Sequence, residues 1–465
     1  MKNCTLRNIT KAVSGTYFGP EENLDREIEN ACFDSRKIQK DGLFFATRGE
    51  RTNGHAFLKD IYEKGALCAV TEREVTKEDL PEGMDVSEVS CIVVEDAFIA
   101  IRKLAAFYRK QLCVKVVGIT GSVGKTSTKE MIAAVLSEKY NVLKTEKNHN
   151  NALGLSQTIF ALRPEHEVAV LEMGISDFGE MALLASVARP DIGVITNIGQ
   201  CHLENLGDRD GIFRAKTEFF GYLPPEGKVV LNGGDDLLAA VKNVCGSKPV
   251  FYNKEGECYA TDIEEKGLLG SSCIIHTGEE QIRAEIPIPG RHQILNAMAA
   301  ASVGKLLGLS GSQIEAGIRK TAVIDGRNKV IDMGRFVVID DCYNANPVSM
   351  KAGLALLDQA KGRSVAVLGD MFELGDGERQ LHRQVGEAMA QESMRPDVLV
   401  CIGDLAASIY EGAVSVSEKY LFATKEEFLE KMETILQTGD TILVKASHGM
   451  AFETLVQEMK KRCED

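Results

Sequence analysis

The stretch GITGSVGKTSTKEM, residues 118–131, decides the fold of the middle of this chain. It follows an apolar run, 113–117, and opens a helical pattern, so a glycine-rich turn joins a strand to a helix. In such a turn the glycines let backbone N–H groups point at phosphate oxygens, and the helix N-terminus adds positive potential. We therefore predict a phosphate-binding loop.

The residues of this loop have separate predicted roles. Gly121 and Gly124 give the backbone its freedom, Lys125 reaches the terminal phosphates, and Thr126 offers a hydroxyl to Mg²⁺. The stretch departs from the full G-x-x-x-x-G-K-S/T pattern, because Ile119 takes the place of the first glycine. The alternative is an ordinary glycine-rich turn. The strand before it and the helix after it favour the phosphate loop.

The length and the net charge limit the classes of protein to which this chain can belong. The 465 residues suggest roughly three domains of about 150 residues each. The formal net charge of -14 argues against a protein that coats nucleic acid or an anionic membrane, because those partners need a basic face. No apolar run is long enough for a membrane span or a signal peptide. We expect a cytoplasmic protein with no nucleic-acid partner and no membrane insertion.

The order of predicted elements divides the chain into three domains of the α/β class. Residues 1–110 mix short strands with polar turns and end in an amphipathic helix, which predicts a small α+β domain. Residues 111–325 alternate apolar strands and helices around the phosphate loop, which predicts a parallel sheet with helices on both faces. Residues 326–465 repeat the alternation and predict a Rossmann-like open α/β domain. We further expect a β-meander over 250–290, before a return to helix.

Polar side chains follow the predicted strands of the central domain. Glu172, Asn197 and His202 stand at or just after strand ends, where doubly wound sheets bind ligands, so they are candidates for contacts with phosphates and metal. A salt bridge for Glu172 and an ordinary surface or core position for His202 are the alternatives. Lys216 lies on a predicted helix, and its spacing alone predicts a solvated lysine or an ion-pair partner.

Further polar clusters occur in loops and in the last domain. The segment NHNNALG, 148–154, suits either a tight loop or polar substrate contacts. The segment IDDCYNANPVSM, 339–350, carries more polar groups than a helix cap needs, before a helix expected near Pro347. The segments 369–382 and 444–450 also end strands with polar groups. Together the three strand ends suggest a substrate face turned toward the phosphate loop.

The motifs, taken together and in chain order, resemble those of the Mur ligases of peptidoglycan synthesis. The resemblance rests on these segments: TGSVGKTST (120–128), NHNNALG (148–154), LEMG (171–174), NIGQCHLENLG (197–207), RAKTEFF (214–220), GRHQILNAMAA (290–300), DGR (325–327) and DDCYNANPVSM (340–350). The segments YNANP and GDMFELG are most similar to the family member that joins D-Ala-D-Ala to a UDP-N-acetylmuramoyl-tripeptide. The resemblance implies that ATP phosphorylates the tripeptide carboxylate and that the dipeptide amine attacks the acyl phosphate.

The resemblance also implies roles for individual residues. It places Lys125, Glu172, His202 and Lys216 in catalysis, with Thr126 and Glu172 on one Mg²⁺, and His202 and a carbamylated Lys216 supporting a second. The implied contacts with ATP come from Gly121, Ser122, Gly124, Lys125, Thr126, Ser127, Asn296, Arg327, Tyr343, Asn344 and Asn346. The implied substrate contacts come from Ser35, Arg36, Thr47, Arg48, Asn53, Gly54, His55, Asn150, Asn151, Asp341 and Lys445. The resemblance thus makes residues 1–110 a UDP-substrate domain and residues 111–325 the ATP-binding domain. The enzyme is expected to be a monomer.

Two departures from the family pattern and two rival functions stay open. GLSQ stands where relatives often have Gly-x-Pro, and Ala446 and His448 stand where a glycine and an arginine are usual. The histidine lacks the fixed charge of arginine, which bears on the acceptor carboxylate. One rival is another amide ligase, such as folylpolyglutamate synthase or a ligase that adds a single amino acid. The other is a non-catalytic phosphate-loop switch.

Overall fold

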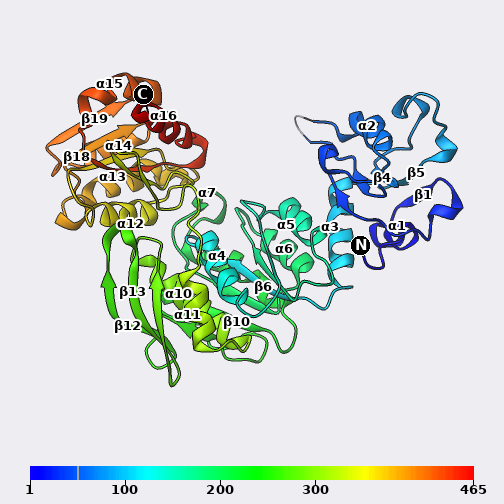
Figure 1. Cartoon of the computed structure of the whole chain (residues 1–465), viewed down its shortest axis with the longest axis horizontal. Helices are drawn as coiled ribbons and strands as arrows, with labels where there is room; N and C mark the ends of the chain where they lie inside the picture. The colour runs from blue at the N-terminus through cyan, green and yellow to red at the C-terminus, as the bar shows by residue number, and fades with distance from the viewer. Residues whose placement is uncertain (50–51, 465) are drawn as a thin grey trace.

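Strand β6 (Lys115–Thr120), which leads into the glycine-rich loop, is buried from Val116 onward. Its side chains alternate between two apolar clusters: Val116 packs into one, and Val117 and Ile119 pack into the other. A strand buried on both faces is typical of a parallel sheet between helices. The structure is a computed structural model that describes residues 1–49 and 52–464 (Figure 1).

The central sheet has six parallel strands in the order β11-β10-β9-β6-β8-β7. Besides β6 they are β7 (Val142–Lys144), β8 (Val168–Glu172), β9 (Ile192–Ile195), β10 (Lys228–Asn232) and β11 (Val250–Tyr252). Helices α4 (Lys125–Leu136), α10 (His292–Leu306) and α11 (Gly311–Arg319) contribute to the cluster on one face. Helices α5 (Ala152–Phe160), α6 (Glu180–Ala188) and α8 (Arg209–Thr217) contribute to the cluster on the other face. Two short helices, α7 (Leu203–Leu206) and α9 (Asp236–Ala239), lie in the connections.

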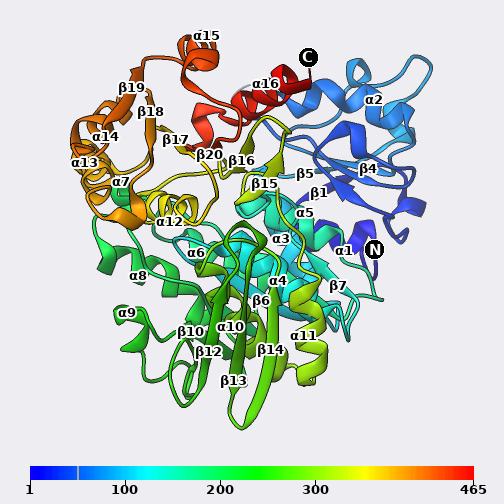
Figure 2. The same ribbon diagram turned by 60° about the vertical axis from the view of Figure 1, so that its left-hand side comes forward.

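One expectation for this domain is wrong. Residues 250–252 do not begin a meander, because β11 pairs in parallel with β10 and completes the central sheet. The antiparallel sheet is formed by β12 (Cys258–Glu265), β13 (Ser271–Thr277) and β14 (Glu280–Ile286). A three-residue apolar strand has no periodicity of its own, so its partner cannot be read from the sequence. Figure 2 shows this small sheet in front of α10.

The N-terminal domain has a five-stranded sheet in the order β1-β5-β4-β3-β2, in which only β1 is antiparallel to its neighbour. Its strands are β1 (Thr16–Phe18), β2 (Ala31–Cys32), β3 (Leu43–Phe45), β4 (Cys68–Thr71) and β5 (Ser90–Val93), with helices α1 (Leu6–Val13), α2 (Leu58–Glu63) and α3 (Ala97–Arg109). The rings of Phe45 and Phe160 stack with centroids 6.1 Å apart. The Tyr108 hydroxyl donates to the Leu162 carbonyl at 2.7 Å. The core of this domain is therefore continuous with that of the central domain.

The C-terminal domain has a six-stranded sheet in the order β15-β16-β20-β17-β18-β19, parallel except for β15 against β16. The strands are β15 (Lys329–Asp332), β16 (Val337–Asp340), β17 (Ser364–Gly369), β18 (Val398–Ile402), β19 (Glu418–Phe422) and β20 (Thr441–Lys445). The helices are α12 (Pro347–Leu357), α13 (Glu378–Ala388), α14 (Ala406–Gly412), α15 (Lys425–Ile435) and α16 (Glu453–Glu464). Helix α12 begins at Pro347, as predicted, and Asn346 caps it through the Ser349 amide. Figure 1 shows the first and last domains at opposite ends of the central one.

The architecture confirms the predicted fold class, with a small α+β domain, a central parallel sheet that carries the phosphate loop, and a Rossmann-like last domain. The division at residues 110 and 325 stays a prediction.

Candidate active site

The glycine-rich loop is held by the end of the neighbouring strand β9. A Cβ atom on Gly121 would lie 1.9 Å from Thr196 Oγ1, and φ is +147° at Gly121 and +84° at Gly124, so both positions require glycine. Asn197 also fixes the loop: its Oδ1 accepts from Val123 N and its Nδ2 donates to Val123 O, both at 3.0 Å. The loop is therefore preformed by the two side chains that directly follow β9.

Lys125 lies at the start of α4, inside the loop. Its Nζ donates to the Gly121 carbonyl at 2.7 Å and to the Ser122 carbonyl at 3.5 Å. Burial lowers the pKa of Lys125. Neutral carbonyls are weaker partners for an ammonium than phosphate oxygens are, so the lysine is poised to exchange them for a phosphate.

Glu172 ends β8 beside the loop, with 2% of its surface exposed. Its Oε1 accepts from Asn150 Nδ2 at 2.9 Å and from Thr126 Oγ1 at 3.3 Å. Its Oε2 is buried and has no hydrogen-bond partner among the described residues. Orphaned buried carboxylate oxygens are rare, and a hydroxyl next to a carboxylate suits Mg²⁺, which keeps several waters and substrate phosphates as ligands. The donors present therefore fit a magnesium ion.

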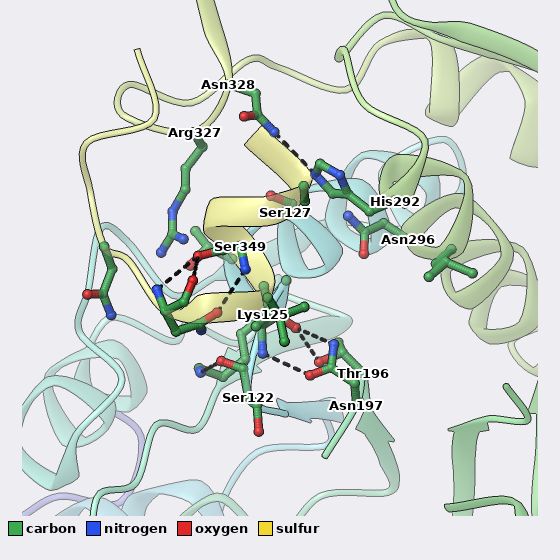
Figure 3. A pocket seen from close by; sticks show the side chains of 18 of the residues that line it. Ser122, Lys125, Ser127, Thr196, Asn197, His292, Asn296, Arg327, Asn328 and Ser349 are labelled. Carbon is green, nitrogen blue, oxygen red and sulfur yellow. Dashed lines mark hydrogen bonds between the residues drawn. The ribbon is translucent and has the colours of Figure 1, made fainter. Parts of the chain in front are cut away.

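A cavity of about 220 Å³ separates the loop from the C-terminal domain. Figure 3 shows Lys125 and Ser122 facing Ser349 of α12, with His292 and Asn296 of α10 and the linker residue Arg327 around them. Eleven of the predicted site residues line it, namely Ser122, Gly124, Lys125, Thr126, Ser127, Asn296, Arg327, Asp341, Asn344, Asn346 and Lys445. Of the predicted nucleotide contacts, Gly121 and Tyr343 are not among the lining residues. The structure thus brings nucleotide and acceptor residues to one cavity.

The C-terminal wall of the cavity contains a buried ion pair. Lys445 Nζ lies 2.6 Å from Asp341 Oδ2 and donates to the Asn344 carbonyl at 3.0 Å. Tyr343 stands just behind this wall, where the Arg327 guanidinium lies over its ring, 4.1 Å from the centroid. The pair joins two strand ends of the last domain, and the stack holds the linker against them.

The burial of Lys216 differs from what the sequence pattern of its helix predicts. Its side chain is fully buried, where the helical spacing predicts a solvated lysine. Burial lowers the pKa of Lys216 to about 8, and the charge of Lys125 adds to this effect. Cys201, which precedes His202, is its other electrostatic neighbour. A buried amine of lowered pKa beside the phosphate-loop lysine is a functional-site candidate.

His202 is engaged across the domain interface. Its Nδ1 lies 2.7 Å from Oε2 of Glu373 in the C-terminal domain, and both residues have left-handed backbone conformations. The described residues contain no group of three or more His, Cys, Asp or Glu side chains placed to hold one metal ion. Within that part of the chain, neither His202 nor Glu172 belongs to such a group.

Comparisons with known proteins agree with this geometry. Family models of the Mur ligases match the catalytic domain at residues 27–109, the middle domain at 119–304 and the glutamate ligase domain at 326–448. The UDP-N-acetylmuramoyl-tripeptide--D-alanyl-D-alanine ligase of Bacillus subtilis is 36% identical over 98% of each chain. The chain belongs to the Mur ligase family.

Two solved Mur ligase structures are also similar to this one. The MurF structure from Acinetobacter baumannii has a TM-score of 0.87, with 31% identity over 98% of each chain. The MurF ligase from Thermotoga maritima, solved in complex with ADP, has a TM-score of 0.80 and 26% identity, and the match covers 94% of this chain and 98% of that one. The likeness thus spans all three domains.

The predicted substrate residues of the N-terminal domain of this Mur ligase gather at the end of β3. Arg48 Nε lies 3.2 Å from Glu72 Oε2, and the Glu72 amide donates to His55 Nε2 at 3.3 Å. A Cβ atom on Gly54 would lie 2.7 Å from the Thr47 amide nitrogen, so the turn there is tight. Their role in binding substrate stays a prediction.

Three further predicted residues of this domain make local contacts. Asn53 Oδ1 accepts from the His55 amide at 3.1 Å and caps the turn. Arg36 pairs with Asp34 at 2.9 Å and is largely exposed, and the Ser35 carbonyl accepts from Lys64 Nζ at 3.0 Å. Asn151, in the central domain, likewise caps α5 through the Gly154 amide, as the loop alternative predicts. Among the described residues of the N-terminal domain, none lines the nucleotide cavity.

Some cavity residues were not singled out from the sequence. The His292 ring accepts from Asn328 Nδ2 at 3.2 Å through Nε2, and burial lowers the pKa of this histidine. Thr128, which does not itself line the cavity, donates from Oγ1 to Asn296 Oδ1 at 2.8 Å and so orients the predicted nucleotide asparagine. The motif GRHQILNAMAA contains His292, and its place at the start of a helix was the available signal.

The buried lysine predicts a measurable pH dependence of stability. Because folding lowers the pKa of Lys216 from 10.5 to about 8, the folded state binds fewer protons than the unfolded state between these values, and stability rises with pH there. As pH rises through this window, we expect the free energy of unfolding of the wild type to increase by roughly 3 kcal/mol more than that of the Lys216→Met variant. Denaturant titrations from pH 7 to 11 in CO₂-free buffer measure the difference. Lys242→Met, at an exposed lysine, is the control and should show the pH dependence of the wild type. If the stability of Lys216→Met also depends on pH as that of the wild type does, the amine of Lys216 is not buried with a lowered pKa.

No helix among residues 1–49 and 52–464 has the length and apolar character that crossing a membrane requires.

Proposed function

We propose that this Mur ligase joins D-Ala-D-Ala to the terminal carboxylate of a UDP-N-acetylmuramoyl-tripeptide, with ATP as the source of energy. The observation that carries the proposal is the cavity in which Lys125 of the phosphate loop faces Asp341 and Lys445 of the last domain. The full-length similarity to ligases of this name supports the choice of substrates.

The chemistry explains why the cavity needs two walls. A carboxylate is a poor electrophile, so one of its oxygens attacks the γ-phosphorus of ATP, the bond to the β,γ-bridging oxygen breaks, and ADP leaves. The dipeptide amine then attacks the acyl carbon, and phosphate leaves with the former carboxylate oxygen. Phosphoryl transfer depends on charge neutralisation and positioning. We assign the first to Lys125 and Arg327, and the second to the wall with Asp341 and Lys445.

We propose that Mg²⁺ is held by Thr126 and Glu172, whose buried Oε2 has no hydrogen-bond partner among the described residues. When bound, it would neutralise phosphate charge. Lys216 would act as a carbamate: its neutral amine takes up CO₂ and releases a proton, which converts a buried cation into a carboxylate-like anion. The lowered pKa of Lys216 supports this step, because only the neutral amine reacts. With His202 it would support a second metal ion once the contact with Glu373 opens.

We further propose that the N-terminal residues around Arg48 and His55 bind the UDP part, and that the enzyme acts as a monomer. Figure 1 shows this domain and the C-terminal domain apart. Since the reacting atoms must approach to about 3 to 3.5 Å and water must be excluded, the outer domains would close on the central one.

Acceptor choice tests the proposed function. We expect D-Ala-D-Ala to be joined with a kcat/KM at least about a hundredfold above that of D-Ala or L-Glu, because a missing residue removes contacts that position the amine. Products are identified by mass, and phosphate release is measured with ATP, tripeptide and dipeptide each omitted in turn. Equal use of L-Glu or D-Ala would leave only an amide ligase of other specificity. Phosphate release that needs neither peptide substrate would indicate a phosphate-loop switch.

A further inference from the structure

Lys129 is a buried lysine for which the proposed reaction has no role. It lies on α4 one turn after Lys125, and 1% of its side chain is exposed. Burying an ammonium is costly unless it is paired. Its Nζ lies 3.1 Å from Glu130 Oε1 and 3.8 Å from Glu172 Oε2. The lysine therefore pairs with the same carboxylate that faces the phosphate loop.

These residues form a row of alternating charges. Lys144, with 43% of its side chain exposed, pairs with Glu130, Glu130 pairs with Lys129, and Lys129 approaches Glu172. The row holds two positive and two negative charges, so Glu172 is balanced before any cation arrives. Its outer end is open to solvent, while its inner end is buried.

The contact with Glu172 is an ion pair without a hydrogen bond. The carboxylate is oriented through Oε1 by Asn150 and Thr126, and its buried Oε2 accepts no hydrogen bond from any residue that the structure describes. At 3.8 Å the ammonium attracts Oε2 but leaves its lone pairs unused. Glu172 Oε2 can therefore still bind a metal ion, but the positive charge of Lys129 lies close to that ion.

We propose that Lys129 is a positioning residue that balances Glu172 and weakens binding of a free divalent cation, so that the metal is taken up together with the nucleotide phosphates. A nearby ammonium repels a dication, whereas the negative triphosphate offsets this repulsion. The inference rests on the proposed nucleotide and metal binding at Thr126 and Glu172. Beyond that proposal, it states that the metal ion is bound together with the nucleotide and not before it.

Direct Mn²⁺ titrations of the full-length enzyme, with free Mn²⁺ followed by electron paramagnetic resonance, test the inference. Without nucleotide, Lys129→Met should bind Mn²⁺ on the order of tenfold more tightly than the wild type, since this is the effect of one charge on a dication at about 6 Å under full water screening. Lys144→Met removes the same charge from the outer end of the row and should leave Mn²⁺ affinity as in the wild type. A purely structural role for Lys129 would change stability but not Mn²⁺ affinity.

A second variant keeps the test independent of folding. Lys129→Met/Glu130→Gln removes a complete ion pair, keeps the net charge, and should also bind Mn²⁺ more tightly. If the folded variants bind Mn²⁺ no more tightly than Lys144→Met does, the inference is overturned. Titration of Mn²⁺ with ADP separates this failure from that of the proposed function: a wild type that binds Mn·ADP keeps the nucleotide site, and one that binds neither form overturns both.

Discussion

Lys125→Ala is expected to lower kcat for ligation by on the order of a thousandfold or more, because it removes the cation that neutralises the transferring phosphate. Among the described residues, the Lys125 Nζ donates hydrogen bonds to the Gly121 and Ser122 carbonyls, and neither bond is part of the hydrophobic core. Its loss removes a half-buried charge and little packing. The variant should therefore unfold within a few degrees of the wild type.

The measurement is steady-state phosphate release with all three substrates, alongside thermal unfolding followed by circular dichroism. Lys242→Ala, at an exposed lysine of the same domain, is the matched control and should retain full activity. A folded Lys125→Ala variant with near-normal turnover would contradict the assignment of the phosphate loop.

Lys216→Ala is expected to lose most activity, at least about a hundredfold, because it removes the anion that the carbamate would supply on the metal side of the cavity. Addition of formate or acetate should restore part of the activity, since a small carboxylic acid can enter the space that the side chain leaves. Wild-type activity should fall in CO₂-depleted buffer and recover when bicarbonate is added.

Activity is measured at several concentrations of each acid, with Lys125→Ala as a variant that carboxylates should not rescue. A Lys216→Ala enzyme that works at the wild-type rate would refute the role of the residue. A wild type indifferent to CO₂, combined with no rescue of the variant, would refute the carbamate.

Local patterns predict the central fold well. The run before the loop, the glycines and the helix that follows each signal their structure within a few residues, and β6 and α4 form as expected. Strands β7 and β19 were not predicted. They stand at sheet edges and are half-buried, so neither gives a clear apolar run. Strand β11 was assigned to the wrong sheet, since pairing is decided by residues distant in sequence.

The sequence likewise predicts some features of the candidate site and not others. Gly124, Lys125 and Thr126 belong to one short motif, so their convergence on the cavity follows from the sequence. The burial of Lys216 does not follow, because its helix has the pattern of a solvated lysine and its burial depends on other segments of the chain, such as those that carry Cys201 and Lys125. The partner of His202 is likewise unpredictable, since Glu373 comes from another domain.

The most direct test of the acyl-phosphate ligation follows one oxygen atom. The tripeptide carboxylate is labelled with ¹⁸O, the enzyme is given ATP and D-Ala-D-Ala, and the released phosphate and the peptide product are analysed by mass spectrometry. We predict one ¹⁸O atom in each phosphate released and a product extended by the dipeptide. Unlabelled phosphate, or phosphate released without a peptide product, would contradict ligation through an acyl phosphate in this cavity.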